Sequence, residues 1–532
     1  MLGPLSPPTQ IIPVVLIGLG VDYAIHLTNR TRAELGDGRT VADATTTAID
    51  RVGVALGLAT VTTVVGFLTN LTSPVPALRD YGVLAAVGIA AAFLLALTVI
   101  PAVRVLLDRR AQRSDRLPRS ALAAGDDRLL PVVMGRVAAV ADRHPVPVVF
   151  VAFVVGGVVG LVGFRQLETE FSLTDFLPED DPAVEVLDVL EREFGGGAAE
   201  TTDVLVRGAG VGSVEVHNET AALVDRLAPD PLVVASPEGG AVAETPATLV
   251  ASAVAEGGPL AASLQAAGAR PDGRLDASAD AGALYRMLLE EMPEVASQRL
   301  AIDDEGAVVA TLVTLETRAG EERAEALATA LEQGFGPLSD HGLQVDPVST
   351  PIVNREITGL LGDSQLVSLL TSVIAAMVLL TGYYGFVERH GLLGVLTVTP
   401  VGLVLLWTFA AMATTGIPFG PITATISALA VGIGVPYTIH VTSRFLEDRV
   451  RYGPGEAVRQ TVRHTGAALA GSALTTMAGF GVLVSSSLRP FQQFGLVTVY
   501  TIGFSLLAST VLLPSLLELW DRRLRRRSSG TP

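Results

Sequence analysis

The chain of 532 residues contains neither cysteine nor lysine. Without cysteine it can form no disulfide bond and no thiolate-ligated metal site. Three further patterns are missing: the lysine-containing phosphate loop of nucleotide hydrolases, the Gly-x-Ser-x-Gly turn of serine hydrolases, and the His and Cys spacings of zinc sites. The sequence therefore predicts a protein that is not an enzyme and that uses neither a cofactor nor a metal ion.

Charged residues are also scarce, at 17% of the chain, whereas 49% of the residues are hydrophobic. Several apolar runs reach the roughly 20 residues that a membrane-spanning helix needs. The first run has no basic segment before it and carries Asp22, unlike a cleaved signal peptide. We therefore expect a polytopic α-helical membrane protein. Its nine expected spans are residues 9–29, 52–72, 79–107, 145–164, 363–386, 392–413, 421–443, 466–486 and 490–518.

Arginine clusters follow four of these spans and indicate the orientation of the chain. They comprise Arg30, Arg32, Arg39 and Arg51; Arg109, Arg110, Arg113, Arg116 and Arg119; Arg444, Arg449 and Arg451; and Arg522, Arg523, Arg525, Arg526 and Arg527. Arginine-rich loops stay on the cytoplasmic side of the plasma membrane. Counting crossings from them places the amino terminus outside, the carboxyl terminus inside and residues 165–362 outside. The last cluster directly follows a span, so it is interpreted as a topology anchor at membrane lipids and not as a nucleic-acid site.

Acidic residues are concentrated in the expected extracellular segment. Residues 165–362 hold two thirds of the chain's 54 Asp and Glu residues and fewer than a third of its 37 basic residues, all of which are arginine. An acidic surface keeps a protein soluble at high salt. The composition therefore suggests a halophilic archaeon, although a GC-rich genome would also favour arginine over lysine.

The extracellular segment has the pattern of an α+β domain. Two β-α-β units are expected, at 202–207, 214–227 and 231–235, and at 307–316, 321–333 and 342–348. An Ala- and Gly-rich insertion of two or three short helices separates them, at about 239–300. This order predicts a ferredoxin-like split unit.

These observations divide the chain into six parts. They are a first membrane block at 1–110, a cytoplasmic linker at 111–144, a single span at 145–164, the extracellular domain at 165–362, a second membrane block at 363–520, and an arginine-rich tail at 521–532.

One stretch of the membrane region occurs twice, at an offset of 414 residues. It reads Gly-Leu-Gly-Val-Asp-Tyr-Ala-Ile-His at 18–26 and Gly-Ile-Gly-Val-Pro-Tyr-Thr-Ile-His at 432–440. The match continues into the following helices, so the membrane region is a duplicated bundle. Asp22 in the first copy corresponds to Pro436 in the second, which leaves one carboxylate where a symmetric duplication would have two.

Asp22 lies near the middle of an apolar helix, where a carboxylate costs several kcal/mol unless it is paired, protonated or in contact with water. His26 lies one turn further along the same helical face. If the two copies pack around a pseudo-two-fold axis, Tyr437 and His440 face the same centre. We therefore expect Asp22 to couple to an ion, with Tyr23, His26, Tyr437 and His440 beside it. The alternatives are a static hydrogen-bonded set that fixes helix packing, or histidines that are solvated near the interface.

The other repeated residues have simpler expected roles. Glycines let membrane helices approach closely, which is the expected role of Gly18, Gly20, Gly432 and Gly434. Pro436 removes a backbone hydrogen bond and predicts a kink; the freed carbonyl groups could hold a cation. The hydroxyl groups in the middle of the next helices either bond to the helix backbone or complete the relay. They belong to Thr62, Thr63, Thr475 and Thr476.

The duplicated span with its Gly-Val-Asp-Tyr sequence, the arginines that close it and the soluble domain between a single span and a five-span block resemble the RND superfamily. The most similar type is that of MMPL and sterol-sensing-domain proteins, which includes Patched-like and hopanoid-exporter-like members. The resemblance implies export of a hydrophobic or lipidic substrate, driven by a proton or sodium gradient. Asp22 matches the first ion-carrying position of the family, whereas Pro436 departs from the second.

In that resemblance the chain matches spans four to twelve of twelve. Pro4 and Pro7 align with Pro418 and Pro421 at the same offset, so we expect that three spans and a first ectodomain are missing, unless this is a natural short form. The partner would then be a separately encoded amino-terminal half or another copy of the chain. Alternative functions are a non-pumping lipid- or sterol-sensing or assembly subunit, or an inactive fragment.

Overall fold

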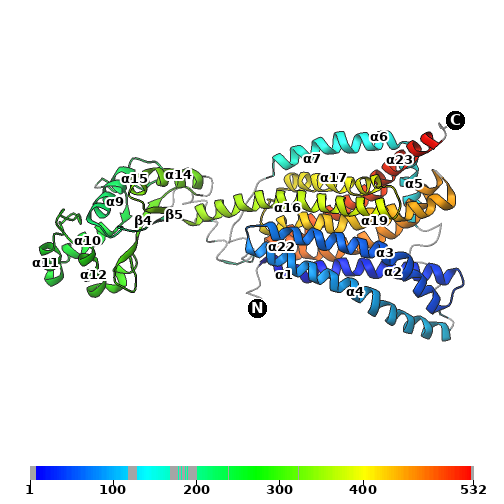
Figure 1. Cartoon of the computed structure of the whole chain (residues 1–532), viewed down its shortest axis with the longest axis horizontal. Helices are drawn as coiled ribbons and strands as arrows, with labels where there is room; N and C mark the ends of the chain where they lie inside the picture. Colours follow the sequence, from blue (N-terminus) through cyan, green and yellow to red (C-terminus); the bar gives the residue numbers. More distant parts are fainter. Residues whose placement is uncertain are drawn as a thin grey trace. The chain divides into compact units, whose positions relative to one another are not determined.

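The computed structural model describes residues 7–114, 116–117, 129–167, 200–237, 239–320, 323–453 and 455–528, with isolated positions between 178 and 189. The chain divides into two compact units, which are described separately. The first comprises Met1–Glu179 and Thr358–Pro532, and the second comprises Asp180–Ile357. The first unit is helical, and the second contains a small sheet with helices (Figure 1).

The helices of the first unit follow the order of the apolar runs. Before the second unit these are α1 (Pro7–Gln10), α2 (Ile12–Gly36), α3 (Val41–Leu68), η1 (Thr69–Thr72), α4 (Pro76–Arg113), α5 (Leu129–Arg143), α6 (Pro145–Phe150), η2 (Val151–Val155) and α7 (Gly156–Arg165). After it come α16 (Thr350–Phe386), α17 (Leu392–Thr415), α18 (Pro421–Ala424), α19 (Ile426–Tyr452), α20 (Glu456–Thr461), η6 (Val462–Gly466), α21 (Ala467–Gly481), η7 (Val482–Ser485), α22 (Arg489–Leu507), η8 (Ala508–Leu512) and α23 (Leu513–Ser528).

Local sequence signals define several helix ends. The Thr40 hydroxyl caps α3 by accepting a hydrogen bond from the backbone N–H of Asp43. Pro76 begins α4, where its missing N–H has no cost. Gly416 ends α17 in the left-handed conformation, at a φ of 66°, which glycine adopts without strain.

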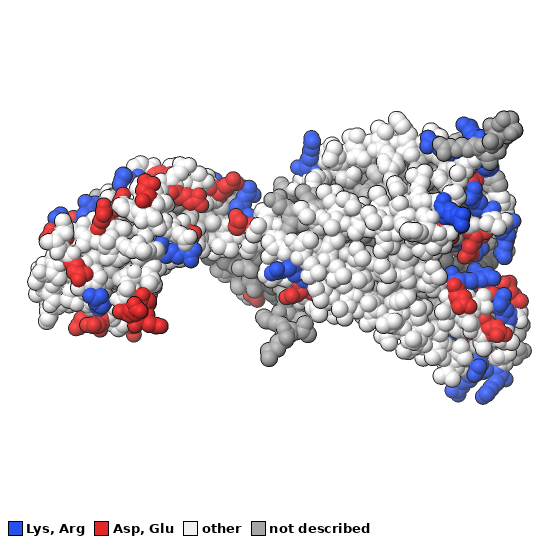
Figure 2. Space-filling model, viewed as in Figure 1, with Lys and Arg blue, Asp and Glu red and all other residues white. Residues whose placement is uncertain are grey.

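Eight helices within the described ranges are long and apolar enough to cross a membrane. The ninth expected span, 421–443, falls in α18 and α19, and α19 is a buried helix of 27 residues. Apolar side chains such as Leu94 of α4 and Val378 of α16 are exposed on the unit's surface. Figure 2 shows that charged side chains gather at one end of this unit, beyond an uncharged belt. The chain is a multi-pass α-helical membrane protein, as expected.

The two repeats pack reciprocally. Helix α2 of the first repeat packs against α21 of the second, and α19 of the second packs against α3 of the first. A Cβ added at Gly18 would lie 2.6 Å from the ring of Phe480. One added at Gly432 would lie 3.0 Å from the methyl group of Thr63. These equivalent glycines therefore set the distance between the repeats.

The second unit contains a five-stranded antiparallel sheet in the order β2-β4-β1-β5, with β3 also paired to β4. Its strands are β1 (Glu200–Arg207), β2 (Ala243–Glu244), β3 (Leu300–Ile302), β4 (Val308–Thr317) and β5 (Gln344–Val348). Val204 of β1 faces Val313 of β4 and Pro347 of β5. Two helices, α9 (Val214–Leu227) and α14 (Ala324–Gly334), contribute Leu223 and Leu327 to the core with this sheet.

This arrangement matches the expected split β-α-β order, with two differences. Residues 231–235 form no regular strand, although the Val234 N–H donates to the Glu316 carbonyl at 2.9 Å. Asp230 holds this segment in a turn by accepting from the Leu232 N–H at 2.8 Å. The insertion contains four short helices instead of two or three. They are α10 (Pro246–Ala255), α11 (Gly258–Ala266), α12 (Ala281–Glu291) and α13 (Pro293–Ala296), around a separate apolar core.

Candidate functional site

Asp22 lies on α2 inside the helix bundle, with only 6% of its surface exposed. Its Oδ1 atom is 3.4 Å from Nε2 of His26, one turn along the same helix. The hydroxyl group of Ser472, on α21, donates a hydrogen bond to the same carboxylate oxygen. The carboxylate therefore has a partner from each repeat, which offsets the cost of placing it among apolar helices.

The two equivalent histidines meet between the repeats. The rings of His26 and His440 are stacked, with centroids 4.2 Å apart and planes inclined by 16°. Both residues are more than nine-tenths buried, and neither Nε2 atom has a hydrogen-bond partner among the described residues. Sequence reasoning placed both residues near one centre, and the structure brings them into direct contact.

The two tyrosines have different neighbours. The Tyr23 hydroxyl accepts a hydrogen bond from Thr60 at 2.9 Å and its ring packs edge-on against Phe93. Tyr437 is buried within reach of Ser472. Both tyrosines and Asp22 line a small cavity of about 10 Å³, which is close to the smallest volume that can hold a water molecule.

Pro436 lies inside α19, which continues past it. Because proline has no N–H, the carbonyl group of Gly432 lacks its usual partner four residues later. The single proton of the Thr63 hydroxyl is shared between that carbonyl oxygen, at 3.0 Å, and the carbonyl oxygen of Ala59, at 2.8 Å. A group of the first repeat thus satisfies the backbone atom that the proline leaves free.

The remaining threonines bond to their own helices. Thr62 donates to the carbonyl of Ala59 at 2.8 Å, and Thr475 donates to Gly471 at 3.0 Å from an exposed position. Thr476 donates to Ser472 at 3.0 Å and also lines the small cavity beside Asp22. Thr475 is therefore placed away from the carboxylate, whereas Thr476 is beside it.

Gly20 and Gly434 make looser contacts than the other two glycines of the repeat. A Cβ at Gly20 would lie 4.0 Å from Ala92, which is ordinary van der Waals contact. One at Gly434 would lie 3.3 Å from the hydroxyl oxygen of Ser505. In each copy of the repeat the first glycine, Gly18 or Gly432, is therefore more crowded than the second, Gly20 or Gly434.

Ser472 is the site residue that sequence reasoning missed. It precedes Thr476 by one turn on the same face of an apolar helix, a weak signal that could have suggested a polar role. Its contact with Asp22 depends on the packing of α21 against α2, which the repeat alone does not specify.

Asp22, His26 and His440 are also the one group of three described side chains whose ligand atoms lie within 4.8 Å of one another. Two imidazoles and a carboxylate are ligands that transition metals accept. Sequence reasoning placed these three residues at one centre but did not suggest a metal site, because the chain lacks the local His and Cys spacings of zinc sites.

A larger cavity, of about 580 Å³, adjoins the two histidines. It lies between α2, α3, α5, α19 and the η6–α21 segment, and its walls include Arg30 and Arg444. His26 and His440 line this cavity, whereas Asp22 lines the small one. The Asp22–His26 contact therefore joins the walls of two cavities.

The sequence profile of the MMPL family matches residues 8–148 and 175–531. The chain belongs to the MMPL family. The membrane protein SCO5905 of Streptomyces coelicolor is 26% identical over 526 residues, which are 97% of this chain and 54% of that protein. The chain thus spans about half the length of this curated relative.

Two further similarities concern a transporter and a solved structure. The hopanoid transporter HpnN of Rhodopseudomonas palustris is 33% identical over 100 residues, 19% of this chain and 12% of that protein. The hedgehog release protein Disp of the water bear Hypsibius dujardini has a similar fold. Its TM-score is 0.66 at 15% identity, over 96% of this chain and 63% of that one. The RND-type fold expected from the duplication is confirmed.

Proposed function

We propose that this chain belongs to a secondary active exporter of a hydrophobic or lipidic substrate, in which Asp22 couples transport to an ion gradient. The observation that carries the proposal is the contact between Asp22 and His26, at 3.4 Å, where each residue lines a different cavity. An acid in this position can exchange an ion with either side when the surrounding helices move. Intramembrane carboxylates at the interface of repeats commonly mark such pathways.

The proton is the proposed coupling ion, and sodium is the alternative. His26 and His440 offer imidazole nitrogens, which can take up and release a proton. Ser472 offers a hydroxyl group that can donate to the carboxylate, as it does in the structure. This donor set suits proton transfer better than the binding of a sodium ion, which prefers several oxygen ligands.

Two features support a lipidic substrate. The chain belongs to the MMPL family, and one of its relatives is a hopanoid transporter.

We propose that the protein lies in the plasma membrane, with the arginine-rich end of the first unit in the cytoplasm and the second unit outside.

The test is transport by the purified protein in liposomes with an imposed proton or sodium gradient. Efflux of a fluorescent lipid and the internal pH are followed together. We expect Asp22→Asn to remove gradient-driven transport, because the side chain can no longer bind and release the ion. Asp50→Asn is the matched control, since Asp50 is exposed on α3. If Asp22→Asn transports as well as the parent protein, the carboxylate is structural and the proposal fails.

Two further variants test the arrangement. His26→Gln should shift the pH dependence of transport without abolishing it. His26 contacts the Asp22 carboxylate, but in this proposal the carboxylate itself binds the ion. Pro436→Asp places a second carboxylate at the equivalent position, and it should either be tolerated, with transport retained, or alter the number of ions moved per substrate.

The second candidate function is a lipid-sensing or assembly subunit that does not pump. Pro436 favours it, because the second repeat has no acid at the position that carries Asp22 in the first. A parent protein that binds lipid but moves neither substrate nor ions under any gradient would support this alternative.

A further inference from the structure

The larger cavity at the arginine-rich end of the first unit has the dimensions of a ligand site. Its volume is about 580 Å³, within the range of small-molecule sites. Figure 2 shows that blue arginine and red acidic side chains gather at this end of the unit. Residues of both repeats form its walls, so the cavity is a product of the duplication.

The charges on its walls are mainly positive. Four guanidinium groups line the cavity, those of Arg30, Arg51, Arg444 and Arg463, and Glu447 is the lining carboxylate. Repulsion among these arginines would be reduced by an anion bound between them. Such a charge pattern therefore favours a ligand with negative charge.

Two buried acids hold the arginines of the first and second repeats in place. Glu34, with a side chain only 2% exposed, contacts Arg30 at 2.7 Å and Arg51 at 3.4 Å. Asp448 occupies the equivalent position of the second repeat and contacts Arg444 at 3.0 Å, and the lining Glu447 pairs with the same guanidinium group at 3.0 Å. A guanidinium group has five N–H donors, so these contacts leave donors for a ligand. The Nε atom of Arg30 is buried and has no hydrogen-bond partner among the described residues.

One wall is formed by a π-helical turn, η6 (Val462–Gly466). Its wider backbone contributes three consecutive residues to the cavity, Arg463, His464 and Thr465. Single π-helical turns are frequent at functional sites because they redirect side chains that an α-helix would bury. This backbone irregularity places the Arg463 side chain on the cavity wall.

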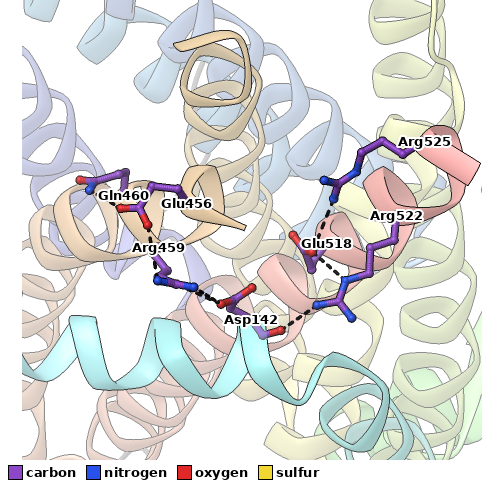
Figure 3. A network of polar contacts seen from close by, with 7 residues as sticks. All are labelled: Asp142, Glu456, Arg459, Gln460, Glu518, Arg522 and Arg525. Carbon is purple, nitrogen blue, oxygen red and sulfur yellow. Dashed lines mark hydrogen bonds and ion pairs between the residues drawn. The ribbon is translucent and has the colours of Figure 1, made fainter. Parts of the chain in front are cut away.

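Helix α5, which packs beside η6, is held by polar contacts with α20 and α23. Figure 3 shows Asp142 of α5 between Arg459 of α20 and Arg522 of α23. Arg459 contacts the Asp142 carboxylate at 2.9 Å, and Arg522 donates to the Asp142 carbonyl oxygen at 3.0 Å. Helix α5 also supplies Pro131 to the cavity. The cavity is thus bounded by helices that are fixed to one another.

The rest of the lining is apolar and comes from Ala33, Val52, Ala55, Pro131 and Ala468. A site with guanidinium groups and an apolar wall suits an amphiphile with an anionic head. We propose that this cavity binds the phosphate group of an anionic phospholipid between Arg51, Arg444 and Arg463. Basic pockets between membrane helices bind such headgroups in other proteins. His26 and His440 line the inner part of the same cavity, so a bound headgroup would lie on the histidine side of the Asp22 site.

The experiment measures lipid binding by the full chain and needs no transport activity. Native mass spectrometry of the purified protein counts bound phosphatidylglycerol against phosphatidylcholine, with and without inorganic phosphate. The test variant is Arg51→Gln/Arg463→Gln, which keeps Arg30 and Arg444 with their buried acids. The control is Arg109→Gln/Arg110→Gln, which removes the same charge from exposed positions at the end of α4.

We expect the parent and control proteins to retain phosphatidylglycerol selectively and the test variant to bind it at least about tenfold more weakly, because charge-assisted hydrogen bonds are lost. Three results would overturn the proposal. Equal retention of both lipids by the parent shows that the cavity does not select a headgroup. An equal loss in the control shows general attraction to surface charge. Displacement of the lipid by millimolar inorganic phosphate identifies free phosphate as the ligand instead of a phospholipid.

Discussion

The hydroxyl group of Thr63 donates a hydrogen bond to the carbonyl oxygen of Gly432, at 3.0 Å. Gly432 precedes Pro436 by four residues, so no backbone N–H is available to this carbonyl within its own helix. The proline that replaces the second acid is thus accommodated by a residue of the other repeat. The asymmetry at Asp22 and Pro436 is therefore built into the contact between α3 and α19.

This contact predicts that Thr63→Val destabilises the protein. The buried carbonyl oxygen of Gly432 would lose its partner, at a cost of about 1–3 kcal/mol. Thr62→Val is the control, because Thr62 is equally buried but bonds to its own helix. Unfolding in detergent, followed by tryptophan fluorescence, measures both. A Thr63 variant no less stable than the Thr62 variant would contradict the interpretation.

A double-mutant cycle tests the same contact more directly. In Pro436→Ala the new N–H can bond to the Gly432 carbonyl, so the Thr63 hydroxyl becomes dispensable. Thr63→Val should then cost less in the Pro436→Ala background, with a coupling of about 1 kcal/mol. Equal costs in the two backgrounds would show that the hydroxyl does not compensate for the proline.

Two glycines of α2 provide a matched pair for helix packing. In Gly18→Ala the new Cβ would lie 2.6 Å from the buried ring of Phe480, whereas in Gly20→Ala it would lie 4.0 Å from Ala92. We expect Gly18→Ala to lower the free energy of unfolding by about 1–3 kcal/mol. Gly20→Ala should be neutral or slightly stabilising, because alanine favours a helix. The same unfolding assay compares the two variants. Equal effects would mean that α2 and α21 separate easily to make room for the added methyl group.

The sequence predicted the spans and the meeting of the repeats because both depend on regular features. Apolar runs identify the segments that cross the bilayer, and the repeat brings His26 and His440 to one axis. The runs do not define helix ends, however. Helix α3 begins at Val41, eleven residues before the expected span at 52–72, because its first turns are amphipathic rather than apolar.

The unpredicted parts depend on contacts between distant segments. Ser472 is a lone serine in an apolar helix until α21 packs against α2. The turn at Asp230 replaces the start of the expected strand at 231–235, where only isolated bridges form, at Val233 and Ala235. The arginine-lined cavity was also missed, since its wall at η6 requires a π-helical turn that no local pattern of residues indicated.

In the second unit, a buried histidine predicts a pH-dependent stability. His217 contacts Tyr285 through Nδ1 at 2.6 Å and the Gly273 carbonyl through Nε2 at 2.9 Å. A carbonyl only accepts, so Nε2 carries the proton and Nδ1 accepts from the tyrosine. Burial lowers the pKa of His217 below its ordinary value of 6.5, and the hydrogen bond to Gly273 opposes this shift only in part.

The folded state therefore binds a proton less readily than the unfolded state. Stability of the second unit should be complete above pH 6.5 and fall below it, by at most about 1.4 kcal/mol per pH unit. Hydrogen exchange of peptides from 200–348, corrected for intrinsic rates, measures this in the full chain. His217→Gln should flatten the dependence. His341→Gln, which removes an outer histidine paired with Glu219, should leave the pH dependence unchanged. If instead His341→Gln flattens the dependence and His217→Gln does not, the effect belongs to His341.

The last prediction concerns the orientation of the chain in the membrane. Moving an arginine across the apolar core is costly, so the arginine-rich end of the first unit should stay in the cytoplasm and the acidic second unit should lie outside.

Because the chain has no cysteine, a single introduced cysteine is a unique label site. Glu256→Cys lies at an exposed turn between α10 and α11, and Arg110→Cys lies at the exposed end of α4. A membrane-impermeant maleimide should label Glu256→Cys on intact cells and Arg110→Cys only after lysis. If the pattern is reversed, the second unit is cytoplasmic, and the cavity proposed to bind a phospholipid headgroup opens toward the outer leaflet.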